Sequence, residues 1–316
     1  MLPQTYTLYP EITLYQSDWL KVSELHQIYF EQSGNPQGQP VLFLHGGPGS
    51  GCNPAQRRFF DPAHYRIILL DQRGCGRSQP LGSTDSNTTS DLVEDLNQLR
   101  KHLNIDQWLV FGGSWGSTLA LAYALTYTSN VTGLILRGIF LSSAKELKWF
   151  LGESELFYPE SWQTLIATLS EVEQQDVLKA YQNKIFSDDK SISVPAATAW
   201  NNYEGSIMSL LPSTTAAKPV ADDIQLARAR VQIHYIVNEC FVAQYDFLNS
   251  VHKLSHIPTT IVQGRYDMVC PPLTAWQLKQ VMPHANFQMI PDAGHSGMEP
   301  GTLAALVAAT EQYKTI

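Results

Sequence analysis

Cysteine and charged residues are scarce in this chain. It has 4 cysteines among 316 residues, and no two of them form a Cys-x-x-Cys pair: Cys52, Cys75, Cys240 and Cys270. This pattern argues against a disulfide framework and a structural zinc site, so we expect free thiols, a reducing compartment and no bound metal. Charged residues make up 16%, the formal net charge is −8, and basic residues form no block. Because nucleic-acid binding needs lysine and arginine opposite phosphates, nucleic acid is excluded as a partner.

Long apolar runs are also missing. No stretch reaches the roughly 18 apolar residues that a membrane-spanning helix needs, and the opening residues lack a basic region followed by an apolar one. We therefore expect neither a membrane segment nor a signal peptide, and a cytoplasmic location. Hydrophobic residues make up 44% of the chain, a globular composition that excludes disordered and fibrous folds.

Short apolar runs alternate with helical patterns over most of the chain. The runs are bounded by Gly, Pro or Asp and are too continuous for half-exposed strands, which indicates buried parallel strands. The expected strands are 41–45, 65–71, 108–113, 132–137, 259–264 and 286–290. The expected helices are 91–103, 117–128, 273–281 and 302–313. This alternation predicts an α/β fold with a mostly parallel sheet covered on both faces, and looser alternation over 5–34 predicts one or two antiparallel edge strands.

The strand–helix rhythm fails between about 142 and 255. Helix-like pieces rich in Trp, Tyr, Glu and Gln replace it there. Because this segment separates two strands of one sheet, we interpret it as a helical cap over the carboxyl edge, where open α/β sheets bind ligands. The chain then divides into a first core part (1–141), a cap (142–255) and a second core part (256–316). The alternative is a second domain unrelated to the active site.

A Gly-x-Ser-x-Gly motif is the strongest chemical signal. Gly112-Gly113-Ser114-Trp115-Gly116 directly follows an expected strand and directly precedes an expected helix. On such a sharp turn the serine hydroxyl points out of the sheet, and small residues are needed because neighbouring backbone comes close. We predict that Ser114 is a nucleophile. Epoxide hydrolases and dehalogenases of this architecture have a carboxylate nucleophile at this position. A serine here favours acyl transfer to water instead.

A serine nucleophile needs a base and an orienting carboxylate. In folds with this turn the chain order is Ser, Asp or Glu, then His. Asp267 and His295 each lie just past the carboxyl end of an expected strand, so loops at one sheet edge can bring them to Ser114. Asp292 is a rival for Asp267, but its place three residues before His295 suits a turn better. We predict the triad Ser114, Asp267 and His295.

A glycine-rich loop follows the strand expected at 41–45. The sequence His45-Gly46-Gly47-Pro48-Gly49 stands where this fold supplies an N–H group of the oxyanion hole, and the N–H of Trp115 would be the second donor. We assign the first donor to Gly47. A simple tight turn would fit these glycines equally well. Gly112–Gly116 lacks the lysine of a phosphate loop, so no cofactor is expected.

At these residues the chain resembles the prolyl (proline) iminopeptidases of the α/β-hydrolase superfamily. The matching segments are the glycine loop, Asp71-Gln72-Arg73-Gly74-Cys75-Gly76-Arg77-Ser78, the serine turn, Leu136-Arg137-Gly138-Ile139-Phe140, Gly264-Arg265-Tyr266-Asp267 and Gly294-His295-Ser296. They run almost from end to end and are weakest in the cap. The resemblance implies release of N-terminal proline from peptides, with the cap admitting only chain ends.

The resemblance also implies carboxylates on the cap that pair with the imino group of the substrate. One falls on Glu204; the other falls on Gln232, where this chain has an amide. The amide carbonyl is expected to accept one hydrogen bond, but the missing charge should weaken capture of a protonated amine. Either Glu239 compensates, or the enzyme prefers another substrate.

The resemblance further places Phe140 and Trp149 around the proline ring, although large aromatics are as often plain core. Cys270, three residues after Asp267, is expected close enough to the triad for a bulky thiol reagent to block it, or else to be an inert buried residue.

These observations predict a serine aminopeptidase that takes a peptide with a free N-terminal proline. Two alternatives stay open. An esterase or amidase acting on a small neutral substrate is favoured if Gln232 abolishes selection of the amine. A non-catalytic binding protein on the same scaffold is the remoter one, because this chain lacks no member of the triad.

Overall fold

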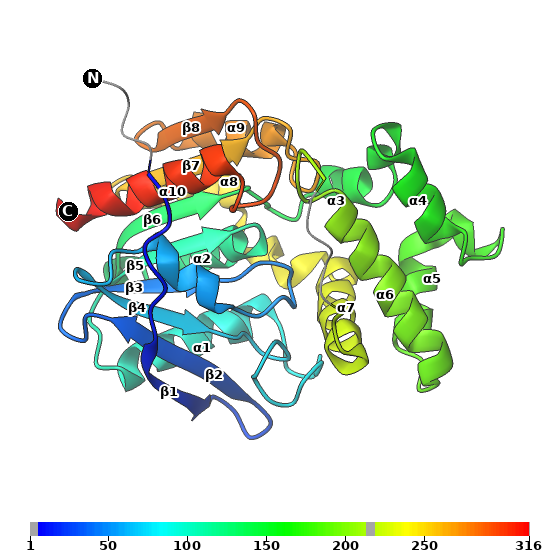
Figure 1. Cartoon of the computed structure of the whole chain (residues 1–316), viewed down its shortest axis with the longest axis horizontal. Coiled ribbons are helices and arrows are strands. Elements are labelled where there is room, and N and C mark those ends of the chain that lie inside the picture. The colour runs from blue at the N-terminus through cyan, green and yellow to red at the C-terminus, as the bar shows by residue number, and fades with distance from the viewer. Residues whose placement is uncertain (1–5, 213–218, 316) are drawn as a thin grey trace.

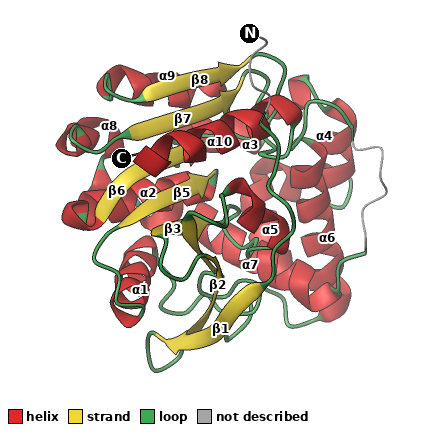
Figure 2. Cartoon of the chain, turned by 60° about the vertical axis from the view of Figure 1, so that its left-hand side comes forward, coloured by secondary structure: helices red, strands yellow, loops and turns green. Residues whose placement is uncertain are grey.

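The computed structural model describes residues 6–212 and 219–315, and its centre is a sheet of eight strands (Figure 1). In chain order the strands are β1 (Leu14–Lys21), β2 (Gln27–Gly34), β3 (Gln39–Leu44), β4 (Tyr65–Leu70), β5 (Trp108–Gly113), β6 (Val131–Arg137), β7 (Thr259–Gly264) and β8 (Asn286–Ile290). Across the sheet they lie in the order β1-β2-β4-β3-β5-β6-β7-β8. Figure 2 shows β8 and β7 at one side of the sheet and β2 and β1 at the other. The α/β prediction is confirmed.

Six of the strands are parallel and two are not. β3 to β8 pair in parallel, whereas β1 pairs with β2, and β2 with β4, in antiparallel fashion. The expected strands therefore match β3 to β8 within two residues at each end. The looser pattern over 5–34 corresponds to β1 and β2, with residue 5 outside the described residues.

Both faces of the sheet are buried, which explains the continuous apolar runs. Along β3, Leu42 and Leu44 pack on one side with α1 (Thr89–His102), α2 (Trp115–Thr126) and α9 (Pro272–Val281). Val41 and Phe43 pack on the other side with α10 (Pro300–Gln312), which crosses in front of the strands in Figure 1. Of the helices described, none is long and apolar enough to cross a membrane.

The segment after β6 forms a separate group of helices at one end of the strands (Figure 1). These are α3 (Ala144–Phe150), α4 (Pro159–Ile166), α5 (Val177–Ile185), α6 (Lys190–Ser206) and α7 (Asp222–Val237). They share an apolar cluster of their own, centred on fully buried Trp200 and Tyr181. Backbone of this group closely approaches the loops that follow β3 and β8, at Gly49 and Gly294. The group thus covers the carboxyl edge of the sheet, as a cap would.

By packing, this cap ends earlier than the expected boundary at 255. Residues 239–254, which include α8 (Phe247–Ser250), bury Tyr245, Phe247 and Leu254 in the apolar cluster of α1 and α2. We group them with the core because Tyr245, Phe247 and Leu254 pack in its apolar cluster, although Phe241 also contacts His234 and Tyr235 of α7. Helical composition alone does not distinguish these two environments.

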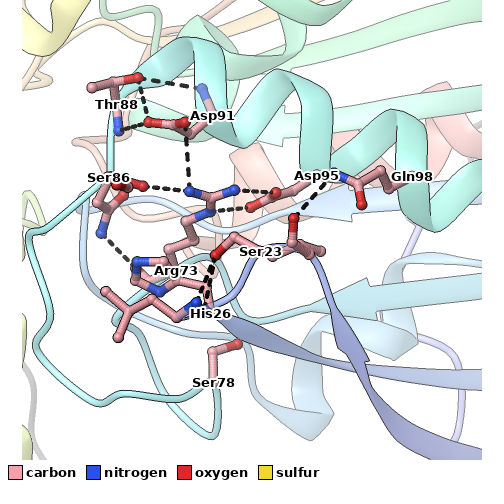
Figure 3. Close-up of polar contacts among 12 residues, drawn as sticks. Ser23, His26, Arg73, Ser78, Ser86, Thr88, Asp91, Asp95 and Gln98 are labelled. Carbon is pink, nitrogen blue, oxygen red and sulfur yellow. Dashed lines mark hydrogen bonds and ion pairs between the residues drawn. The ribbon is translucent and has the colours of Figure 1, made fainter.

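The loop after β4 fastens the cap to the core. The guanidinium of Arg73 donates two hydrogen bonds of 2.6 Å to the buried carboxylate of Asp95 and lies 3.5 Å from Asp91, both on α1 (Figure 3). Asn87 donates to the carbonyls of Arg73 and Ser83 and accepts a 2.9 Å hydrogen bond from the hydroxyl of Tyr235 on α7. One asparagine thus ties the position of α7 to the Arg73 loop.

Replacing Asn87 by alanine should therefore destabilise the protein. The buried Tyr235 hydroxyl and the carbonyls of Arg73 and Ser83 would each lose a hydrogen bond, a cost of about 1–3 kcal/mol. Urea unfolding would measure it. Asn249→Ala is the matched control, because Asn249 is exposed and its side chain bonds only to nearby Asp246; it should change the free energy of unfolding by less than about 0.5 kcal/mol. Equal effects of the two substitutions would contradict the anchoring role.

Candidate active site

Ser114 occupies the sharp turn between β5 and α2. Its φ of 58° and ψ of −128° are strained values that an ordinary strand or helix does not adopt. The flanking residues must be small: a Cβ on Gly112 would lie 2.1 Å from the carbonyl oxygen of Gly116, and one on Gly116 would lie 2.2 Å from that of Leu44. Close backbone packing thus accounts for the glycines of the motif and presents Ser114 at the carboxyl edge.

The structure brings Asp267 and His295 together. Nδ1 of His295 lies 2.8 Å from Oδ2 of Asp267, and both side chains are almost fully buried. The other carboxylate oxygen accepts hydrogen bonds from the N–H groups of Val269 and Cys270, so the loop after β7 fixes its orientation. The rival Asp292 is exposed. The carboxylate beside the imidazole is that of Asp267.

The structure does not join Ser114 to His295 by a hydrogen bond. Nε2 of His295 instead lies 3.1 Å from Nη1 of Arg137, and the same Nη1 donates a 2.9 Å hydrogen bond to the carbonyl of His295. Arg137 ends β6, its backbone carbonyl accepts the N–H of Ser114, and burial lowers the pKa of its guanidinium. Arg137 thus contacts Nε2, the nitrogen with which His295 would accept the proton of Ser114.

This contact fixes the tautomer of the imidazole. A guanidinium only donates hydrogen bonds, so Nε2 must be the acceptor and the proton of the neutral ring resides on Nδ1, facing Asp267. A general base acting on Ser114 needs this same tautomer. The sequence analysis named Arg137 within a matching segment but predicted no role for it. Its position at the end of an expected buried strand could have indicated that it lies near the serine turn.

The two N–H groups predicted for the oxyanion hole belong to Gly47, on the pocket wall beside Ser114, and to Trp115, the residue after Ser114. Within residues 6–212 and 219–315 we find no acceptor for the N–H of Gly47 or that of Trp115. The glycine loop is held from behind by Gln72, which donates its backbone N–H to Nε2 of His45 and its side-chain amide to the carbonyl of His45, both at 3.0 Å. Trp115 completes the link with a 2.8 Å hydrogen bond to Gln72. The loop is therefore rigidly placed.

A small pocket opens at Ser114 between the core and the cap. Its apolar walls come from Phe140, Leu147, Phe150, Ile236, Val269 and Cys270, and its polar lining from Gly47, Glu146, Glu204 and Gln232. Trp149 does not line this pocket: its indole N–H donates to the carbonyl of Met268 and its ring packs against Phe157. The next residue, Phe150, faces the pocket instead, because successive side chains on α3 point in different directions.

Glu204 and Gln232 meet at the cap side of the pocket. Nε2 of Gln232 lies 2.9 Å from Oε1 of Glu204 and 3.2 Å from the carbonyl of Gly47. Oε1 of Gln232 accepts a 2.6 Å hydrogen bond from the indole N–H of Trp200. The amide oxygen, which has two lone pairs, thus already uses one of them on Trp200.

Arg228, and not Glu239, is the charged neighbour of this pair. Nη2 of Arg228 lies 2.8 Å from Oε2 of Glu204. Glu239 is exposed, in a short helical turn that follows α7, and makes no contact with Glu204 or Gln232 in the structure. Sequence reasoning missed Arg228 and Trp200, although their spacing from Gln232 and Glu204 by four residues on a helix was a usable signal.

Cys270 lies on the pocket wall beside Ser114. Burial, together with the nearby carboxylates of Asp267 and Glu146, raises the pKa of its thiol well above the ordinary value. The thiol is thus protonated at neutral pH and acts as a small apolar surface.

Comparison with known proteins places this geometry in a family. A model described as the alpha/beta hydrolase fold matches residues 39–302. The proline iminopeptidase of Arabidopsis thaliana is 49% identical over 314 residues, which cover 98% of this chain and 83% of the relative. That of Xanthomonas citri is 48% identical over 311 residues, covering 97% and 99% respectively.

Solved structures share the fold at low identity. The proline iminopeptidase of Mycobacterium smegmatis superposes with a TM-score of 0.62 at 18% identity, covering 95% of this chain and 99% of that one. An esterase from Exiguobacterium antarcticum gives 0.60, also at 18% identity, with coverage of 94% and 99%. The chain belongs to the α/β-hydrolase family and, within it, to the proline iminopeptidases.

Proposed function

We propose that this protein is a serine aminopeptidase that releases proline from the N-terminus of peptides. The observation that carries the proposal is a small pocket that has Ser114 at one end and the Glu204 carboxylate on the cap side. Ser114 needs only a reactive carbonyl, but a buried carboxylate in the lining of the same pocket suits a nitrogen at the start of a chain. Relatives covering nearly the whole chain are named proline iminopeptidases.

Acylation begins with proton transfer from Ser114 to Nε2 of His295 as the hydroxyl oxygen attacks the carbonyl of the N-terminal residue. Asp267 holds the imidazole and stabilises the positive charge that forms on it. Arg137 must turn away from Nε2 before this step, because one lone pair cannot accept from both partners. Hydrogen bonds between a nucleophile and its base are often looser in substrate-free enzymes than in the reacting complex.

The negative charge on the carbonyl oxygen is stabilised by the N–H groups of Gly47 and Trp115. The loss of a single such donor costs about 3 kcal/mol of transition-state stabilisation, so two rigidly held donors contribute substantially. His295 then gives its proton to the leaving amine, the peptide bond breaks, and proline stays attached to Ser114 as an ester. Water, deprotonated by His295, hydrolyses the ester and restores the serine.

The pocket accounts for selection of a chain end. Its apolar walls, including Phe140 and Phe150, suit a proline ring, and α6 and α7 close it behind Glu204 and Gln232. A residue preceding the proline would have to occupy the space of these side chains, which are almost fully buried. The substrate is therefore a peptide with an unblocked N-terminal proline.

Ser114→Ala should abolish the release of β-naphthylamine from proline β-naphthylamide. Without the nucleophile, turnover should fall by a factor of about 10⁴ or more, while the midpoint of urea unfolding stays close to that of the wild type. Turnover within tenfold of the wild-type value would refute the assignment of Ser114.

An esterase or amidase for small neutral substrates remains the second candidate, because Arg228 neutralises Glu204. Comparing proline β-naphthylamide with its N-acetylated form separates the two functions. An aminopeptidase should reject the acetylated compound by at least about a hundredfold in kcat/KM, because it has no N–H for Glu204 and adds bulk against the cap. Similar values for both compounds would favour the amidase.

A further inference from the structure

The part of the pocket that would receive the substrate nitrogen carries no net charge. We call Glu204, Gln232 and Arg228 the nitrogen subsite. Glu204 contributes one negative charge, Arg228 one positive charge at 2.8 Å, and Gln232 none. A protonated imino group entering this subsite would leave one unbalanced positive charge in a place where Glu204 and Gln232 are almost fully buried, which is costly.

Arg228 has unused hydrogen-bonding capacity at the same place. Its Nε is buried without a partner in the structure, while Nη2 bonds to Glu204. Donor groups thus exceed acceptors around Glu204. This imbalance disfavours a third donor, such as the second N–H of a protonated amine, and favours an acceptor.

The other ionisable groups that face the pocket have their hydrogen-bond partners outside the nitrogen subsite. From α3, Glu146 uses both oxygens on the N–H groups of Leu141 and Ser143 and on the Ser143 hydroxyl, and burial raises the pKa of its carboxyl. From the glycine loop, burial lowers the pKa of His45, which keeps its ring neutral. From the core, the Asp267 and Arg137 charges oppose each other around His295, and the raised pKa of Cys270 keeps its thiol neutral.

We propose that the nitrogen subsite binds the N-terminal proline with its imino group uncharged, and that Gln232 and Arg228 determine this specificity. The inference rests on the proposed release of N-terminal proline. A terminal amine has a pKa near 8, so about a tenth of the substrate is uncharged at pH 7. This fraction falls about tenfold with each pH unit below 7. The loss of kcat/KM at low pH, the acid limb of the profile, therefore follows the ionisation of the substrate.

Two substrates with different imino pKa values test this directly. Fluorine withdraws electrons and lowers the pKa of the imino group, so the β-naphthylamides of proline and 4-fluoroproline should lose kcat/KM at different pH values. The separation should equal the difference between their titrated pKa values, with the fluorinated substrate active to lower pH. If the limb reported only an enzyme group such as His295, both substrates would lose activity at the same pH, and the inference would be overturned.

Two variants shift the charge of the subsite in the same direction. Gln232→Glu adds a negative charge and Arg228→Met removes a positive one, so each leaves the subsite with a net charge of −1. Either variant should accept the protonated substrate and therefore raise kcat/KM for proline β-naphthylamide at pH 7 about tenfold. The proline and 4-fluoroproline substrates should then lose kcat/KM at the same pH. Because Arg228 is partly exposed, its replacement tests the idea even if Gln232→Glu does not fold.

Gln163→Glu is the matched control. It adds the same charge to the cap, on exposed surface of α4 and outside the lining of the pocket at Ser114. It should leave both limbs in place. Failure of both folded variants to move the limb, or an equal shift in the control, would contradict the inference. Absence of proline β-naphthylamide cleavage at every pH would instead refute the proposed function.

Discussion

The active site depends on the parallel pairing of β5, β6, β7 and β8. Parallel strands end at the same edge, so the residues that follow them gather there regardless of their separation in the chain. Ser114 follows β5, Arg137 ends β6, Asp267 follows β7 and His295 follows β8. Four polar side chains are thereby brought together without a single local sequence motif containing them all.

Burial then gives these side chains their chemistry. Away from water, Asp267 has the N–H groups of its own loop and the ring of His295 as partners, and the ring has one possible tautomer. The same exclusion of water makes each remaining polar partner energetically significant, which is why Gln72 and Trp115 form a continuous hydrogen-bonded support for the glycine loop.

The strands and the positions that end them could be predicted from the sequence, because apolar runs and the residues after them are local signals. Asp267 could be preferred to Asp292 for the same reason. The directions of side chains could not be predicted. Trp149 and Phe150 are neighbours on α3, and which of them faces the pocket depends on how that helix rests on the core. The cap boundary was also set too late, since residues 239–254 pack against α2 through tertiary contacts that composition does not reveal.

One hydrogen bond spans the two halves of the site. Nε2 of Gln232, on the cap, donates to the carbonyl of Gly47, the residue proposed as an oxyanion-hole donor. In the proposed mechanism a single glycine residue therefore connects recognition of the ring nitrogen with stabilisation of the oxyanion. A substitution at position 232 would then affect turnover as well as affinity.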